Sequence, residues 1–101
     1  MAGSPRRRLE WSARAGADLA AIDAWYAQFG ETTAGRVVSR ILGVAGLLQD
    51  HPFLGPQGIK PGTRHRIVDE YPYTIVFRVT PSKVRVIRVL HQRRAYFQRM
   101  R

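Results

Sequence analysis

The apolar residues of this 101-residue chain change their spacing once, across a segment of prolines and glycines between residues 51 and 62. Before that segment they recur every three or four residues, the period of an amphipathic helix. After it they alternate every second residue, the period of a strand. Proline removes a backbone donor and glycine relaxes the backbone, so the segment itself is predicted to be a loop. A chain this short forms one domain, and its helical and strand halves are expected to pack as two layers.

The first helix is expected from about Ala13 to Phe29, with Ser12 as its N-cap and Gly30 as its C-terminal cap. One face of this helix is apolar and is formed by Ala15, Leu19, Ile22, Tyr26 and Phe29. That face is predicted to turn towards the core.

A second helix is expected to begin at a cap formed by Thr32 or Thr33 and to end before His51-Pro52. Its apolar stripe consists of Val37, Ile41, Val44 and Leu48, widened by Val38, Leu42 and Ala45. Gly43 and Gly46 lower helix propensity by about 1 kcal/mol each relative to Ala, and we interpret them as positions where another element packs closely. Because few residues join the two helices, they should form an antiparallel hairpin.

Four strands are predicted, one before the helices and three after them. The first covers Arg6 to Trp11, and the others alternate over residues 64–69, 73–79 and 84–91. Turns are expected at Tyr71-Pro72 and at residues 80–83, and such short connections imply antiparallel neighbours. The fold class is therefore α+β, with the order β-α-α-β-β-β. An N-terminal strand and a two-helix hairpin pack on a mainly antiparallel sheet, in one domain over residues 1–101. Residues 1–5 are expected to be disordered, and a short tail or helix should follow the last strand.

Positive charge is concentrated after the loop. Residues 64–101 contain nine Arg and one Lys against Asp69 and Glu70, a balance of +8 out of +10 for the whole chain. Fifteen of the 17 basic residues are Arg, whose planar fork matches phosphate or carboxylate with two hydrogen bonds. The composition predicts an anionic partner: a nucleic acid, a nucleoprotein machine or an acidic protein.

Several chemistries have no support in the sequence. The chain contains no cysteine, and His51, His65 and His91 have no paired metal-ligand spacing. Neither a phosphate-binding loop nor a dinucleotide fingerprint is present, and the seven acidic residues are scattered. No cofactor and no metal are predicted. No apolar run is long enough to span a membrane, so no membrane partner and a cytoplasmic location are expected.

One set of basic and aromatic residues remains along the predicted sheet: Arg64, Arg66, Arg78, Arg85, Arg88, His91, Arg93, Arg94 and Tyr96. Guanidinium groups bind phosphate, rings stack on bases, and histidine exchanges protons near neutral pH. The alternative for each arginine is a solvated strand face. For His91 it is a structural hydrogen bond, and for Tyr96 it is docking of the C-terminus on the core.

At this point the chain resembles a known family. The segments Leu9-Glu10-Trp11-Ser12, Tyr71-Pro72-Tyr73 and Ile75-Val76-Phe77-Arg78, with Val86 to His91 and then Arg93-Arg94, are similar to the RelE/ParE toxins of type II toxin-antitoxin modules. The resemblance covers about Arg8 to Arg94 and is closer to ParE. It implies the same β-α-α-β-β-β order and a co-encoded antitoxin that neutralises the toxin.

The resemblance implies two possible activities. ParE-type members poison DNA gyrase without a catalytic centre of their own, whereas RelE-type members cleave mRNA on the ribosome. The RNases place an arginine about where this chain has Val68-Asp69-Glu70, and an acid there would repel the scissile phosphate. Gyrase inhibition is therefore the favoured activity, and plasmid or chromosomal maintenance is the role that it implies. A passive basic nucleic-acid-binding module is a third possibility.

Site residues follow from these alternatives. For a gyrase inhibitor we expect no catalytic residues, and a surface contacting gyrase or its bound DNA that consists of Arg85, Arg88, His91, Arg93 and Arg94. An acidic antitoxin that folds on binding is expected to contact Arg64, Arg66, Arg78 and Arg93. A ribosome-dependent RNase would instead use Arg64, Arg66, His91, Arg94 and Tyr96.

Overall fold

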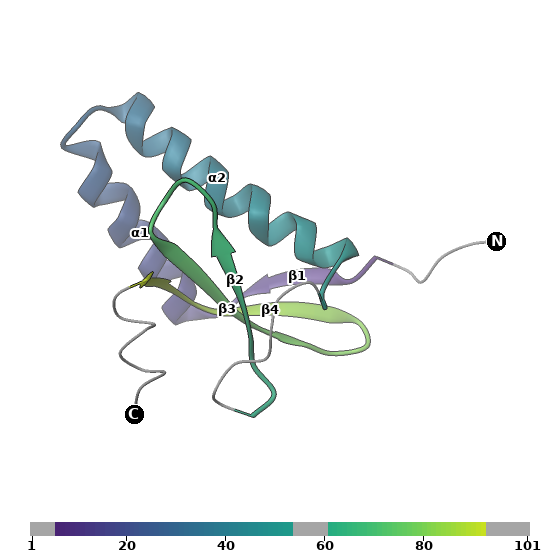
Figure 1. The fold of residues 1–101 in the computed structure, drawn as a ribbon. Coiled ribbons are helices and arrows are strands. Elements are labelled where there is room, and N and C mark those ends of the chain that lie inside the picture. Colours follow the sequence, from purple (N-terminus) through teal and green to yellow (C-terminus); the bar gives the residue numbers. More distant parts are fainter. Residues whose placement is uncertain (1–5, 54–60, 93–101) are drawn as a thin grey trace.

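Two helices cover one face of a four-stranded sheet in the computed structural model, which describes residues 6–53 and 61–92 (Figure 1). The elements follow the order β-α-α-β-β-β. Their bounds are β1 Arg8–Trp11, α1 Ala13–Ala27, α2 Glu31–Asp50, β2 Arg64–Val68, β3 Tyr73–Val79 and β4 Lys83–His91. The α+β prediction and the predicted element order are confirmed. The expectations for residues 1–5 and for a C-terminal tail or helix fall on residues outside those described.

The sheet has the strand order β1-β4-β3-β2. β1 pairs parallel to β4, whereas β4 with β3 and β3 with β2 are antiparallel, so the sheet is mainly antiparallel as predicted. β1 and β2 are the two edges, and the helical hairpin carries the chain from one to the other across the helix-covered face (Figure 1).

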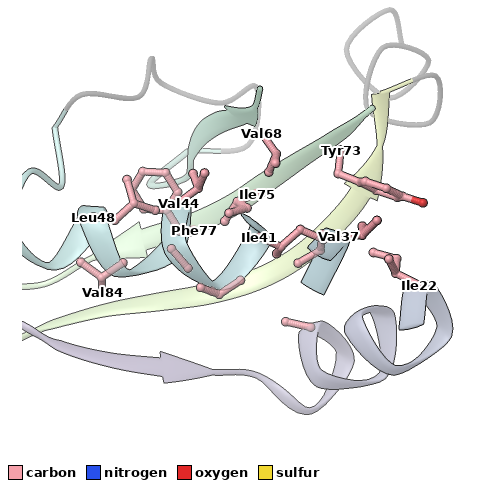
Figure 2. Close-up of a cluster of buried hydrophobic side chains, with 14 residues drawn as sticks. Ile22, Val37, Ile41, Val44, Leu48, Val68, Tyr73, Ile75, Phe77 and Val84 are labelled. Carbon is pink, nitrogen blue, oxygen red and sulfur yellow. The ribbon is translucent and has the colours of Figure 1, made fainter. Parts of the chain in front are cut away.

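The core lies between α2 and the sheet. Phe77 and Ile75 of β3 lie beneath Ile41 and Leu48 of α2, and all four side chains are fully buried (Figure 2). Burying each such side chain contributes about 1.5 to 3 kcal/mol. The predicted α2 stripe is confirmed, since Val37, Ile41, Val44 and Leu48 are all buried.

Ser12 caps α1 as predicted, and it does more than cap. Its Oγ accepts a hydrogen bond from the Ala15 backbone N–H at 3.0 Å and donates one to the Ile87 carbonyl at 2.7 Å. The same hydroxyl therefore starts the helix and fixes it to β4.

The predicted end of α1 is wrong by two residues. The helix ends at Ala27 with Gln28 as its C-cap, and Phe29 is 61% exposed rather than part of the apolar face. Gly30 is not the C-cap residue, although its backbone N–H donates to the carbonyl of Ala27 at 3.0 Å. It precedes α2 at φ 115°, a backbone conformation that glycine adopts without a Cβ clash, and it takes the N-cap position predicted for Thr32 or Thr33.

The close-packing interpretation of Gly43 and Gly46 is also wrong. A Cβ built at either position meets no atom within 4 Å among the residues described, although Gly43 is exposed and Gly46 is half-buried. Their cost in helix propensity is not offset there by closer packing.

A bulge in β4 changes which of its residues face the helices. Phe77 pairs with Val86 but Val76 pairs with Arg88, so Ile87 is an extra residue. The predicted alternation of Val84, Val86, Arg88 and Leu90 on one face therefore breaks. After the bulge, Val89 joins the core cluster instead of Arg88.

Asp69 and Glu70 lie in the turn after β2, not in the strand. Glu70 has φ 80°, in the left-handed region that side chains with a Cβ disfavour. The acidic pair therefore interrupts the basic residues at a tight turn rather than on the sheet surface.

Candidate functional site

Strand directions bring basic residues from distant segments to one end of the sheet. β1, β4 and β2 all begin at this end and β3 finishes there, because β1 is parallel to β4 and β3 is antiparallel to both of its neighbours. We call this the basic end. Its basic residues are Arg6, Arg7, Arg8, Arg64, Arg78, Lys83 and Arg85, and they are accompanied by Asp50 and Glu10.

An exposed aromatic ring holds two arginines of the basic end. The guanidinium carbons of Arg7 and Arg64 lie 5.5 Å and 5.0 Å from the centroid of the Phe53 ring. Arg7 is anchored further by its Nε, which donates to the Thr80 carbonyl at 2.8 Å, and by Gln49 Nε2, which donates to the Arg7 carbonyl at 2.9 Å. Cation–π contacts therefore fix two positive charges at one exposed ring.

Arg85, predicted to contact the target, is ion-paired within the chain. Its Nη1 lies 2.9 Å from Glu10, and Lys83 Nζ lies 3.0 Å from the same carboxylate. Hydrogen bonds from Lys83 and then Arg85 lower the pKa of Glu10 from its ordinary value of 4.5. A target that binds Arg85 would have to compete with Glu10 in solvent, where such pairs are weak.

Arg88 has a structural partner of its own. Its Nε and Nη2 donate to the two oxygens of Asp18 at 2.8 Å and 3.1 Å, and the Val89 backbone N–H donates to Asp18 at 2.9 Å. The hydrogen bond that Arg88 donates to Asp18 is the main cause of the raised pKa of Arg88. Both side chains are more than four-fifths buried, so this pair joins α1 to the part of β4 beyond its contact with β1.

His91 belongs to an aromatic group at the opposite end of the sheet. Its ring lies 5.7 Å from that of Tyr73, and Tyr26 lies 6.4 Å from both Tyr73 and Tyr71. Burial and a hydrogen bond with Tyr26 raise the pKa of Tyr73, so this phenol stays neutral at physiological pH. His91 is exposed, and its contacts make it part of this end of the fold.

The register separates the predicted RNase residues. Arg64 is level with Phe77 and Val86, whereas His91 is level with Tyr73, the partner of Val68. The backbones of Arg64 and His91 are therefore separated by four residues along the strand direction, about 13 Å, and by two interstrand steps across the sheet, about 10 Å. Arg64 and His91 therefore lie towards different ends of the sheet, and Arg66 lies closer to the level of His91. Arg94 and Tyr96 fall outside the described residues, so the full set remains a prediction.

The other predicted contacts lie in two places. Arg64 and the exposed Arg78 belong to the basic end, whereas the half-buried Arg66 lies further along β2, beside Ile75 of β3. Arg93, expected to contact both target and antitoxin, falls outside the described residues, as does Arg94. The sequence analysis missed Arg7 and Phe53. Their only sequence signal was an Arg run before the first strand and an aromatic residue directly after a helix-ending proline.

The described ranges contain no group of three or more His, Asp or Glu side chains arranged to hold a metal ion. No helix within those ranges is long and apolar enough to cross a bilayer.

Comparison with known proteins identifies the family. Residues 9–96 match the family model of the ParE toxin of the type II toxin-antitoxin system parDE. The chain is 31% identical over 86 residues to "Putative toxin Y4kP" of Sinorhizobium fredii, covering 85% of this chain and 88% of that protein. Its fold matches a solved chain from the chromosomal ParDE system of P. aeruginosa with a TM-score of 0.76 and 27% identity, covering 85% of this chain and 96% of that one. The family model covers most of the chain, and this chain belongs to the ParE toxin family of type II toxin-antitoxin systems.

Proposed function

We propose that this toxin inhibits DNA gyrase, causes cleaved DNA to accumulate, and is neutralised by a co-encoded antitoxin. The observation that carries the proposal is the match to the ParE toxin model over residues 9–96. Gyrase poisoning is the activity that the resemblance to ParE-type rather than RelE-type toxins implies. The spacing of Arg64 and His91 along and across the sheet supports it, since an RNA-cleaving site needs its groups around one phosphate. The toxin has no catalytic centre of its own in this proposal and acts in the cytoplasm.

A supercoiling assay tests the activity. Purified toxin added to gyrase and relaxed plasmid should suppress supercoiling and increase linear DNA after detergent and protease treatment. Unchanged supercoiling with no linear DNA would rule out gyrase as the target.

The RNase alternative rests on Arg64 and Arg66, which share one face of β2. It predicts cuts at the ribosomal A site, detected by primer extension on translated messages. Cleavage of mRNA at the A site without gyrase inhibition would favour the RNase over our proposal. A passive nucleic-acid-binding module would show neither activity, and its expression would leave growth unaffected.

The antitoxin is proposed to place acidic side chains against Arg64, Arg66 and Arg78, with Arg93 beyond the described residues. These arginines come from β2 and β3, so the antitoxin would cover part of the basic end. Reversal of the Arg78 charge to Glu should weaken antitoxin binding, and reversal at Arg14, exposed on α1, serves as the control. Equal affinities for the two variants would remove the electrostatic part of this proposal.

A further inference from the structure

The group formed by Arg7, Phe53 and Arg64 has no part in the core, yet the chain positions it tightly. Phe53 is 61% exposed directly after the end of α2, and it stabilises the fold little by burial. Two guanidinium groups nevertheless lie within 5.5 Å of its ring centroid, so the ring brings two like charges, which repel one another, towards one place. An anion between or beside them would remove that repulsion.

The anchoring of Arg7 leaves its terminal nitrogens for an outside acceptor. Its Nε is engaged by the Thr80 carbonyl, while in the described part of the chain no hydrogen bond from its Nη atoms is found. A guanidinium held against a ring presents its N–H edge in a fixed direction, which suits the paired oxygens of a phosphate.

The surroundings favour a polyanion with regularly spaced charges. The basic residues occupy the ends of all four strands, from edge strand β1 to edge strand β2, rather than a single groove. Three interstrand steps span about 14 Å, close to the roughly 12 Å width of the DNA major groove. The basic residues are therefore spread over a width comparable with that of one groove, and within that width Arg7 and Arg64 converge on the Phe53 ring.

We propose that the basic end binds the phosphate backbone of double-stranded DNA, and that Phe53 acts as the support that fixes Arg7 and Arg64 for this contact. The inference rests on the proposed gyrase inhibition and extends it, because the toxin would then contact DNA directly. It can be tested on bare DNA, so its failure and the failure of gyrase inhibition are distinguishable. Backbone contacts carry no sequence information, so binding should be nonspecific and salt-dependent.

The test uses fluorescence anisotropy with a labelled duplex of about two helical turns, titrated with the full-length toxin at several NaCl concentrations. Arg7→Gln should reduce the slope of log affinity against log salt by about one. Arg36→Gln is the control. Arg36 is an exposed arginine in the first turns of α2, at the hairpin tip away from the basic end, and its loss should leave the slope unchanged.

Phe53→Leu separates support from charge. It keeps every charge and an apolar side chain, so the salt slope should stay while affinity falls by up to about five- to thirtyfold, the loss expected from two cation–π contacts. Phe29→Leu is the matched control, because Phe29 is also 61% exposed but contacts Trp25 rather than arginines. Circular dichroism establishes that each variant is folded.

Three results would overturn the inference: equal DNA affinities for Phe53→Leu and Phe29→Leu, equal salt slopes for Arg7→Gln and Arg36→Gln, or weakened binding of an oligoglutamate peptide with DNA binding unchanged. The third would assign the group to an acidic protein partner instead. DNA binding with the expected losses would support the inference even if the supercoiling assay were negative.

Discussion

At the scale of single residues, the same side-chain type has different roles according to its partner. Arg85 pairs with Glu10 in solvent, Arg88 is held by both oxygens of Asp18, and Arg7 lies against Phe53. Only the second arrangement is largely buried, so only there does loss of the partner leave a charge without compensation. Arg88, expected from sequence to contact the target, is therefore better placed to hold the fold.

Asp18→Asn should destabilise the protein by about 2 to 3 kcal/mol, because Arg88 would lose its counter-ion in a mostly buried position. Asp23→Asn on the exposed side of the same helix is the control and should change stability little. Urea unfolding followed by circular dichroism measures both. Similar midpoints for the two variants would contradict a structural role for the Asp18–Arg88 pair.

At the scale of elements, α1 and its N-cap residue bind the part of the β4 edge that β1 does not cover. β1 pairs with β4 as far as Val86, and beyond the bulge the Ser12 hydroxyl and the Asp18 carboxylate meet the backbone of Ile87 and Val89. A helix start thus replaces the missing strand partner and satisfies groups that would otherwise need water. The bulge at Ile87 makes these contacts possible. The extra residue shifts the register of β4 by one position, so each following side chain faces the other side of the sheet.

Ser12→Ala should therefore reduce the free energy of unfolding by more than the loss of an N-cap hydrogen bond alone would. We expect a loss of about 2 kcal/mol, at the upper end of measured N-cap effects, because both the Ala15 and the Ile87 hydrogen bonds disappear. Ser39→Ala, exposed within α2, is the control and should be neutral or slightly stabilising. Equilibrium unfolding in urea measures the free energy of unfolding of both variants. A loss of stability in Ser12→Ala no greater than that in Ser39→Ala would contradict the dual role of Ser12.

The pairing of β1 with β4 should also depend on pH through Glu10. Lys83 and Arg85 lower its pKa in the folded protein, so its contribution to stability is complete above the ordinary value of 4.5. It is then lost as pH falls through the lower, folded-state pKa. Unfolding midpoints of the wild type and Glu10→Gln should thus differ at pH 6, and the difference should shrink as the pH falls below the ordinary value of 4.5. A difference that persisted or widened in acid would contradict the assignment.

At the scale of the whole molecule, charge and aromatic groups lie at opposite ends of one sheet. The basic end combines the starts of β1, β2 and β4, whereas His91, Tyr73 and Tyr26 lie at the other end. A chain of net charge +10 with so many cations at one end opposes its own compaction. An acidic antitoxin or DNA at that end would relieve the repulsion.

Raising NaCl from about 0.01 M to about 0.15 M shortens the screening length from roughly 30 Å to roughly 8 Å. The midpoint of thermal unfolding of the free toxin should therefore rise over this range. The double variant Arg8→Gln, Arg78→Gln should start from a higher midpoint and gain less from salt, as scanning calorimetry would show. A midpoint that falls with salt would mean that attractive ion pairs such as Arg6–Asp50 outweigh the repulsion.

The sequence by itself determined the elements, their order and the two-layer packing, because hydrophobic period and capping act over a few neighbouring residues. It placed Ser12 at the start of α1 and the stripe from Val37 to Leu48 in the core, and it also indicated the ParE resemblance. Only the tertiary structure decided the site. The fold brings Arg7 and Phe53 into contact range of Arg64. It also places Arg85 at the basic end, away from Arg88 and His91. The physical reason is that a binding surface depends on strand order, strand direction and one bulge, and these arise from contacts between residues far apart in the chain.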